Sequence, residues 1–279
     1  MLNILAGKDR RFPSSQAKRN KPRAHRFKDC VAALAITLVV LASGRAALAQ
    51  TAAPCAAMRF EGAAYTVCTF DVRRDTLQMF WKGADGRPYG AFAPLAAALN
   101  AKGRELRFAM NAGIYEADTS PVGLFVEESK QLRKPNLRDG ASNFYLKPNG
   151  VFFVGDSTVG VIESARFVAA APKARYATQS GPMLVVDGQL NPKILPTGTS
   201  AKTRNGVCAR DGVTAVFAIS EEPVTFYAFA RLFRDALNCP NALYLDGSIS
   251  SLFSADLKRD DALWRIGPII AVTATSPSR

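Results

Sequence analysis

Short runs of apolar and β-branched residues, separated by turn dipeptides, make up most of the chain after residue 50. Three segments carry a central Asn-Gly or Asp-Gly between two such runs, which is the strongest short-range signal for a β-hairpin. They are NFYLKPNGVFFVG (143–155), PMLVVDGQL (182–190) and VCARDGVTAVFAI (207–219). Further strands are predicted at 65–70, 77–81, 106–110, 123–126 and 266–272. The pattern therefore predicts mainly antiparallel sheet.

Two segments have helical spacing instead. Residues 91–102 are rich in alanine and leucine and stop at Gly103, a common C-terminal cap. Thr225 can cap a second helix, which leads into the apolar run Ala242–Leu245. Its apolar residues recur every three or four positions, at Phe226, Phe229, Ala230, Phe233 and Leu237. Hairpins followed by strand, helix and strand indicate an α+β fold with a mixed, largely antiparallel sheet.

The first 49 residues differ in kind from the rest. A basic stretch up to Lys28 precedes an apolar run at 31–42, and Ala-Leu-Ala stands directly before Gln50. This is the layout of a secretory signal peptide. The apolar run is shorter than the roughly 20 residues that span a bilayer, which favours cleavage, although the long basic region leaves an uncleaved anchor open. We expect residues 1–49 to be a signal peptide and 50–279 to form one domain, periplasmic or secreted.

The predicted leader carries most of the net charge of +13. It holds ten Lys or Arg and two Asp, so eight of the thirteen net positive charges leave with it. The remaining excess suits a protein that handles anionic ligands. No cluster of Lys and Arg with aromatic residues follows residue 50, so the sequence does not predict nucleic-acid binding.

Four cysteines remain after Cys30 is removed with the leader. An even number of cysteines in an exported protein predicts disulfides, and three pairings are open. We favour Cys55 with Cys68 and Cys208 with Cys239, because the first two flank a short segment that can fold back on itself. The wide spacing does not suit a zinc site.

The single histidine, His25, lies in the leader. Ser-His-Asp catalysis, Cys-His catalysis and histidine-ligated zinc are therefore excluded in the mature chain. The sequence also lacks a Walker loop and a GxGxxG fingerprint, so we expect neither a nucleotide cofactor nor a metal. Carboxylate chemistry remains, with arginine, asparagine and main-chain amides to hold an anion.

The apolar run Ala242–Leu245 ends in a carboxylate. Asp246 follows the run directly and is itself followed by Gly247 and Ser248. This predicts a site at a strand end, and the alternative is an ordinary Asp-Gly turn. Polar residues interrupt other strands similarly, each with a loop, a cap or a solvated side chain as the alternative. They are Asn111, Gly113, Asn143, Gln179, Arg204 and Glu222. Together these groups suit a polyhydroxylated or phosphorylated ligand.

Seven motifs in this order resemble the phosphodiester glycosidase family, which includes the uncovering enzyme and many bacterial exported proteins. They are FAMNAGIY, SPVGLFVE, NFYLKPNGVFFVG, ATQSGPMLVVDG, RNGV, ISEEPVTF and NALYLDGSISSL, between about Phe60 and Val272. The resemblance matches Asn111 and Gly113 to the family's Asn-Gly-Gly loop and Arg204 to its arginine before a strand. Asp246 and Gly247 match its Leu-Asp-Gly-Gly motif, whose second glycine is Ser248 here.

The resemblance implies an exported glycosidase that hydrolyses the bond between a sugar anomeric carbon and a phosphodiester. A departing phosphate monoester is a weak base, so one good carboxylate can suffice. Asp246 is expected to be nucleophile or general base, with Glu222 as the second carboxylate. Arg204 is expected to hold the phosphate, assisted by main-chain amides. The remaining substrate-binding residues expected are Asn111, Gly113, Asn143, Gln179, Gly247 and Ser248.

Three alternatives stay open at this point. A non-catalytic cell-envelope protein could bind a glycan or phosphoglycan on the same scaffold. A metal-dependent phosphodiesterase would need more clustered acidic ligands. Arg204 and Asp246 could also form an ion pair with no catalytic purpose. The expected partner is a sugar phosphate or phosphoglycan, with no nucleic acid, no cofactor and no membrane contact after signal cleavage.

Overall fold

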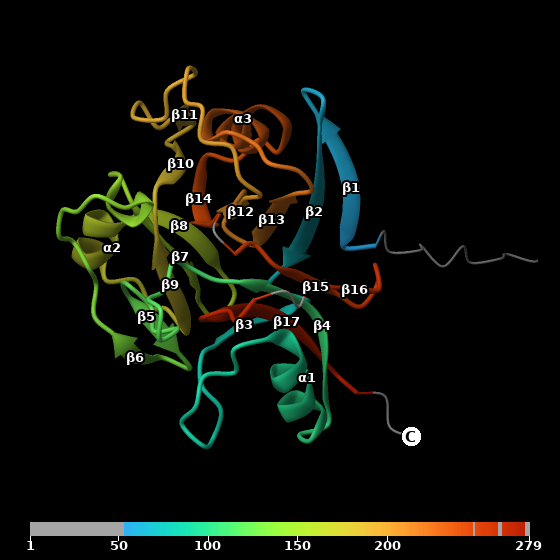
Figure 1. Ribbon diagram of the computed structural model, residues 1–279. Coiled ribbons are helices and arrows are strands. Elements are labelled where there is room, and N and C mark those ends of the chain that lie inside the picture. Colours follow the sequence, from blue (N-terminus) through green and yellow to red (C-terminus); the bar gives the residue numbers. More distant parts are fainter. Residues whose placement is uncertain (1–52, 248, 262–263, 277–279) are drawn as a thin grey trace, which may run out of the picture. The chain divides into compact units, whose positions relative to one another are not determined.

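Strands predominate in the computed structural model of the chain, which describes residues 53–247, 249–261 and 264–276. All of these residues belong to one unit, Thr51–Arg279. The predicted signal peptide, 1–49, lies outside the described residues. The described strands form one seven-stranded and two five-stranded sheets (Figure 1).

The seven-stranded sheet has the order β1-β2-β13-β12-β14-β10-β11. Two of the predicted hairpins lie in it: β10 pairs with β11, and β12 pairs with β13. Asp187 and Gly188 both have positive φ angles, 47° and 79°, as a two-residue hairpin turn requires. The strands are β1 (Cys55–Phe60), β2 (Ala63–Asp71), β10 (Met183–Val186), β11 (Gln189–Leu190), β12 (Asn205–Ala209), β13 (Thr214–Ser220) and β14 (Asn241–Asp246).

The second sheet has the order β16-β15-β4-β17-β3, and the third has the order β6-β5-β9-β7-β8. The second sheet contains β3 (Thr76–Phe80), β4 (Arg104–Asn111), β15 (Leu252–Ser254), β16 (Arg259–Asp260) and β17 (Ile269–Thr275). The third contains β5 (Phe125–Glu127), β6 (Lys130–Arg133), β7 (Gly150–Val154), β8 (Val159–Glu163) and β9 (Tyr176–Ser180). Every strand pairing among the described residues is antiparallel, which corrects the expected mixed sheet.

The predicted hairpin at 143–155 is wrong. Residues Asn143–Tyr145 form a short 3₁₀ helix, η1, and β7 begins only after Asn149. Pro148 cannot donate a ladder hydrogen bond, and the Asn149 side chain donates to the Phe144 carbonyl at 3.1 Å. The Asn-Gly pair therefore ends a loop, and β7 pairs with β8 and β9 instead.

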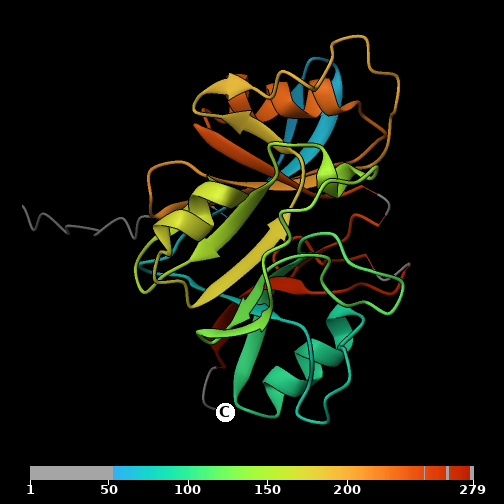
Figure 2. The same ribbon diagram turned by 90° about the vertical axis from the view of Figure 1, so that its left-hand side faces the viewer.

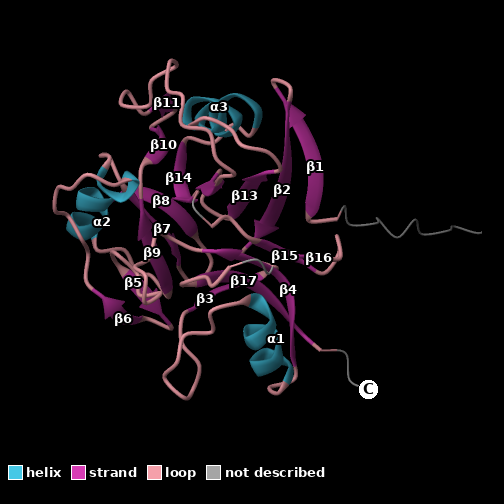
Figure 3. Ribbon diagram, in the orientation of Figure 1, coloured by secondary structure: helices cyan, strands magenta, loops and turns pink. Residues whose placement is uncertain are grey.

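Each sheet carries a helix on its outer face, and Figures 2 and 3 show the three helices well separated from one another. The predicted helices are α1 (Phe92–Asn100) on the second sheet and α3 (Phe226–Arg231) on the seven-stranded sheet. The Thr225 hydroxyl accepts the Ala228 N–H at 3.1 Å, as the capping prediction requires. A π-helical turn, η2 (Leu232–Ala236), continues α3. The third sheet carries α2 (Ser164–Ala170), which the pattern did not predict.

The three sheets share one aromatic core. Phe217 of β13 lies 5.0 Å from Phe108 of β4 and 5.8 Å from Phe152 of β7, measured between ring centroids. All three rings are at least 99% buried. Burying three phenylalanines stabilises the fold by several kcal/mol, at roughly 1.5–3 kcal/mol for each side chain. The strand ends that surround this core are therefore held in fixed positions.

Two disulfides brace the seven-stranded sheet, and the predicted pairing is confirmed. Cys55 and Cys68 are bonded across β1 and β2, and Cys208 of β12 is bonded to Cys239, just after η2. Such bonds indicate an oxidising compartment. Within the described ranges, no helix has the length and apolar character needed to cross a bilayer.

Candidate functional site

Asn205 is the centre of a buried polar cluster where β4, β12 and β14 come together. Its Oδ1 accepts the Asp246 N–H at 2.9 Å and the Ser250 hydroxyl at 3.4 Å. Its Nδ2 donates to the carbonyl and the Oδ1 of Asn111, at 3.1 and 3.0 Å. The Asn205 amide is thus used completely, and it ties the second sheet to the seven-stranded sheet.

Asn111, the last residue of β4, is held with its amide in one orientation. Its Oδ1 accepts from Asn205 and from the Ser251 N–H at 2.9 Å. Its Nδ2 is buried and has no hydrogen-bond partner among the described residues. Because a buried donor without a partner is costly, it requires an explanation. An acceptor oxygen of a bound ligand would satisfy it.

Asp246 ends β14, as the sequence predicts, and is 8% exposed. Its Oδ1 accepts the Gly247 N–H at 2.6 Å, and its carbonyl accepts the Ser250 hydroxyl at 2.9 Å. A side chain at position 247 would collide with the Tyr244 hydroxyl, so the glycine is a steric requirement. The carboxylate is thus placed by the strand and by the loop that follows it.

Two tyrosines lie within reach of the Asp246 charge. Burial raises the pKa of Tyr115, and the negative charge of Asp246 raises it further. Burial also raises the pKa of Tyr244, where Asp246 acts in the same direction and Arg204 in the opposite one. Both hydroxyls therefore keep their protons at neutral pH. The Tyr115 hydroxyl donates to the Arg265 carbonyl at 3.2 Å.

A cleft of about 580 Å³ opens beside this cluster. The loop after β14, the segment before β12, the end of β13 and the β16 region contribute to its walls. The lining residues are Lys202, Thr203, Ile219, Ser220, Glu221, Gly247, Ile249, Ser250, Ser251, Arg259, Asp261 and Trp264. Gly247, whose N–H donates to the Asp246 carboxylate, and Ser250, whose hydroxyl donates to the Asp246 main-chain carbonyl, both line the cleft, so Asp246 is adjacent to the cleft wall.

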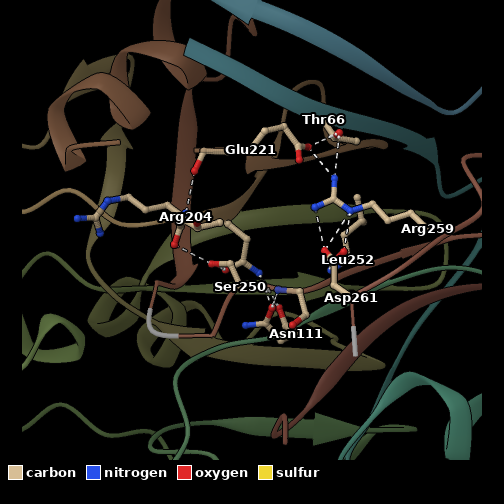
Figure 4. Close-up of polar contacts among 12 residues, drawn as sticks. Thr66, Asn111, Arg204, Glu221, Ser250, Leu252, Arg259 and Asp261 are labelled. Atoms are coloured by element: carbon tan, nitrogen blue, oxygen red, sulfur yellow. Dashed lines mark hydrogen bonds and ion pairs between the residues drawn. The ribbon is translucent and has the colours of Figure 1, made fainter. Parts of the chain in front are cut away.

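Charges on the cleft wall are partly paired. Arg259 forms ion pairs with Glu221 at 2.6 Å and with Asp261 at 2.9 Å, and the Thr66 hydroxyl donates to Glu221 at 2.6 Å (Figure 4). Lys202 forms no ion pair with any of the residues that the structure describes. Lys202 is therefore the cleft cation whose charge can serve a ligand.

Arg204 has a different position from the one expected of a phosphate ligand. It is completely buried, and its guanidinium donates to the carbonyls of Val224 and Ser200 at 2.9 and 2.8 Å. The guanidinium lies 3.6 Å from the Phe226 ring centroid, and burial lowers its pKa. In Figure 4 its side chain extends away from Glu221, Arg259 and Asp261. These contacts brace the segment before β12, and the buried Nη1 of Arg204, like Nδ2 of Asn111, has no hydrogen-bond partner among the described residues.

Gln179 also has a structural position. Its Oε1 accepts the N–H groups of Leu124 and Asn136, each at 2.9 Å, and its Nε2 donates to the Asn136 carbonyl and the Ser164 hydroxyl. No hydrogen-bonding capacity of its side chain is left for a substrate. Gly113 packs directly on this segment, because a Cβ there would collide with the Gln179 carbonyl. Both residues therefore position the loop after Asn111.

The remaining expected residues divide into two groups. Glu222 is exposed and accepts the Ala64 N–H at 2.8 Å, and it is not among the described residues that line the cleft. Asn143 is exposed in η1, and its side chain, like that of Arg204, forms a hydrogen bond with Tyr244, which opposes the rise in the Tyr244 pKa. The Tyr244 hydroxyl lies directly against Gly247. Ser248 lies outside the described residues. The structure therefore brings Asn111, Asp246 and Gly247 together, connects Asn143 and Arg204 to them through Tyr244, and leaves Glu222 apart.

Sequence reasoning missed the residue at the centre of the cluster. Asn205 lies next to Arg204, and alternation along β12 would have separated their side chains onto opposite faces. Glu221 and Glu222 both follow a predicted strand, and the sequence favours Glu222 as the second carboxylate, whereas Glu221 is the one of the two that lines the cleft. Among the residues described at 53–276, no three His, Cys, Asp or Glu side chains come together as metal ligands.

The chain belongs to the phosphodiester glycosidase family, whose model matches residues 104–273. The uncharacterized protein YigE of Escherichia coli (strain K12) is 36% identical to it over 209 residues. The match covers 75% of this chain and 79% of YigE. The family and this relative agree with the resemblance seen in the ordered motifs.

Two solved structures have the same fold. The catalytic domain of zebrafish N-acetylglucosamine-1-phosphodiester α-N-acetylglucosaminidase, auto-inhibited by its pro-peptide, matches with a TM-score of 0.53 at 15% identity, over 78% of this chain and 81% of that one. A hypothetical protein from Synechocystis matches with a TM-score of 0.52 at 13% identity, over 79% of this chain and 61% of that one. At these identities the likeness concerns the fold.

Proposed function

We propose that the protein is an exported glycosidase that hydrolyses the bond between a sugar anomeric carbon and a phosphodiester. The observation that carries the proposal is the position of Asp246 at a strand end, where Asn205 accepts its N–H and where its neighbour Gly247 lines a cleft that also contains Lys202. Family membership supports the reaction class. The two disulfides support export to an oxidising compartment, the periplasm or the medium.

The reaction needs one well-placed carboxylate. As general base, Asp246 takes a proton from water while the water oxygen bonds to the anomeric carbon, and the electron pair of the breaking C–O bond leaves with the phosphate. As nucleophile, it bonds to that carbon first, and water then releases the sugar. The phosphate is a weak base and leaves without strong protonation, which suits a mature chain without histidine.

The cleft supplies groups for both halves of the substrate. Lys202 is proposed to hold the phosphate, in place of the buried Arg204, and the Ser250 hydroxyl lies in the same cleft. The free Nδ2 of Asn111 is proposed to donate to a sugar hydroxyl or ring substituent. Glu221 takes over the role of second carboxylate that the sequence assigned to Glu222, because Glu221 lines the cleft.

The test is release of free sugar from the methyl phosphodiester of α-N-acetylglucosamine 1-phosphate by the purified protein. The probe follows the name of the zebrafish neighbour. Asp246→Asn is expected to lower turnover by at least about a hundredfold, the usual contribution of a positioned general base. Asp156→Asn, at an exposed carboxylate on the third sheet, is the matched control and should keep full activity.

Thermal unfolding of both variants is the control for folding: a Tm equal to that of the unchanged protein shows that a loss of activity does not come from unfolding. If Asp246→Asn turned over as fast as the unchanged protein, Asp246 would have no part in the chemistry. If the unchanged protein bound the probe without releasing sugar, the chain would be a glycan-binding member of the family instead.

A further inference from the structure

Trp264 is a large apolar side chain left in water at the cleft. It is 65% exposed, whereas tryptophan is mostly buried in folded proteins. Of the large apolar side chains exposed in the described part of the chain, Trp264 is the one that lines the cleft. The others are Leu137, Val168, Leu195 and Leu257. An indole kept exposed at a polar cleft points to a ligand surface, since folding alone favours its burial.

The main chain directly after Trp264 is held in place by contacts with Tyr115 and Gly90. The Arg265 carbonyl accepts the Tyr115 hydroxyl at 3.2 Å, and the Ile266 N–H donates to the Gly90 carbonyl at 2.9 Å. The Tyr115 ring packs so closely on Gly267 that a Cβ there would collide with it. The pKa of Tyr115 is raised by burial and, in addition, by the negative charge of Asp246. Trp264 thus precedes a fixed piece of main chain, and it lines the same cleft as Gly247, the neighbour of Asp246.

We propose that Trp264 is a stacking platform for a pyranose ring of the substrate, and that it determines specificity for glycan phosphodiesters. The electron-rich face of an indole attracts the weakly positive C–H groups on one face of a sugar ring, and the contact also removes apolar surface from water. Lys202 lines the same cleft and supplies a positive charge for the phosphate. The inference rests on the proposed function and adds the class of group that the cleft receives.

The kinetic test compares Trp264→Ala, Trp264→Phe and Leu195→Ala on the methyl phosphodiester of α-N-acetylglucosamine 1-phosphate. Trp264→Ala should raise KM about tenfold with kcat changed less than twofold, because stacking binds ground state and transition state alike. Trp264→Phe keeps an aromatic face and should stay within about threefold of the unchanged KM. Leu195, which is 60% exposed but is not among the described residues of the cleft, should tolerate alanine without effect. A Trp264→Ala protein with unchanged KM would overturn the proposal.

A binding test that needs no turnover uses the two tryptophans of the chain. Trp81 is 8% exposed and Trp264 is 65% exposed, so acrylamide in solution quenches mainly the emission of Trp264. Added α-N-acetylglucosamine 1-phosphate should reduce the quenching constant by about half when the sugar covers the indole. The Trp81→Phe variant, in which all emission comes from Trp264, should show the same protection.

The two tests separate the platform from the reaction. Protection of Trp264 without sugar release from the phosphodiester would refute hydrolysis and keep the platform. Sugar release with an unprotected Trp264 and an unchanged KM in Trp264→Ala would keep hydrolysis and refute the platform. Neither release nor protection would refute both.

Discussion

At the scale of single residues, the site depends on hydrogen-bonding capacity that is almost fully used inside the protein. Both the Oδ1 and the Nδ2 of Asn205 are hydrogen-bonded, to Asn111, Asp246 and Ser250. Gln179 does the same farther from the cleft. Beside these saturated amides, Nδ2 of Asn111 and Nη1 of Arg204 are buried donors without a partner among the described residues. In such a network, a residue with spare capacity is the one that faces the ligand.

The adjacent residues Glu221 and Glu222 form a matched pair for testing which carboxylate serves the cleft. Glu221 lines the cleft and pairs with Arg259, whereas Glu222 bonds the Ala64 N–H outside it. Glu221→Gln should lower kcat/KM by about tenfold, since it removes the charge that orients Arg259 and accepts from the substrate. Glu222→Gln should stay within about twofold. The reverse order of effects in sugar-release assays would restore the assignment made from the sequence.

Asp246 and Arg204 show which features of single residues could be predicted from the sequence. A carboxylate directly after an apolar run can be recognised in the sequence, and Asp246 does end a strand. The orientation of the Arg204 side chain depends on Phe226, Val224 and Ser200, which close over it only in three dimensions. Local pattern therefore finds strand-end groups, whereas contacts that form only in three dimensions decide what each side chain can still bind.

At the scale of elements, turn chemistry explains both the successes and the failures of prediction. Asp187-Gly188 turns β10 into β11, as its dipeptide predicts. The hairpin of β5 and β6 turns at Glu128-Ser129, which both have positive φ, 48° and 64°, and carry no turn signature. Tertiary packing imposes that turn on residues that do not favour it. Pattern reading found the strand at β5 but had no signal for its partner.

The strained turn predicts a stabilising change. Replacing Glu128 by Asn and Ser129 by Gly matches the left-handed backbone of this hairpin. The free energy of unfolding should rise by about 1 kcal/mol, since each L-residue in that region costs roughly that much. For a unit of this size the gain corresponds to a Tm increase of about 2–4 °C. Glu116→Asn, in a loop, is the control, and a lower Tm for the double variant would contradict the interpretation.

At the scale of the whole unit, three sheets meet on one core, and their contacts include a half-buried carboxyl group. Glu127 of β5, in the third sheet, accepts a hydrogen bond from the Trp81 main chain, directly after β3 of the second sheet. Trp81 also packs edge-on against Phe125 at 6.3 Å. Burial raises the pKa of Glu127 to about 7. The contact between these sheets therefore favours a protonated carboxyl group.

This shift predicts a pH-dependent stability. The folded protein holds the Glu127 proton up to about pH 7, whereas an unfolded glutamate releases it near 4.5, so the contribution is complete below about pH 4.5 and is lost as the pH rises to 7. Glu127→Gln should remove that decline and raise the free energy of unfolding at pH 8 by about 1 kcal/mol after allowance for solvent screening. Urea unfolding at pH 5 and pH 8 measures both. An equal pH slope in the variant would assign the decline to other groups.

The strand order of the second sheet sets a condition on when the protein can fold. The strand β17 (Ile269–Thr275) lies between β4 and β3, and β3 pairs with no other described strand. On the ribosome, β3 is complete at Phe80 and β4 at Asn111, long before the strand that joins them begins at Ile269. Asn111, at the end of β4, likewise meets Ser251 from the last part of the chain. The site can therefore assemble only after Ser251 and β17 have been made, so the part of the chain made before them stays without its partners during synthesis, which is compatible with the proposed export.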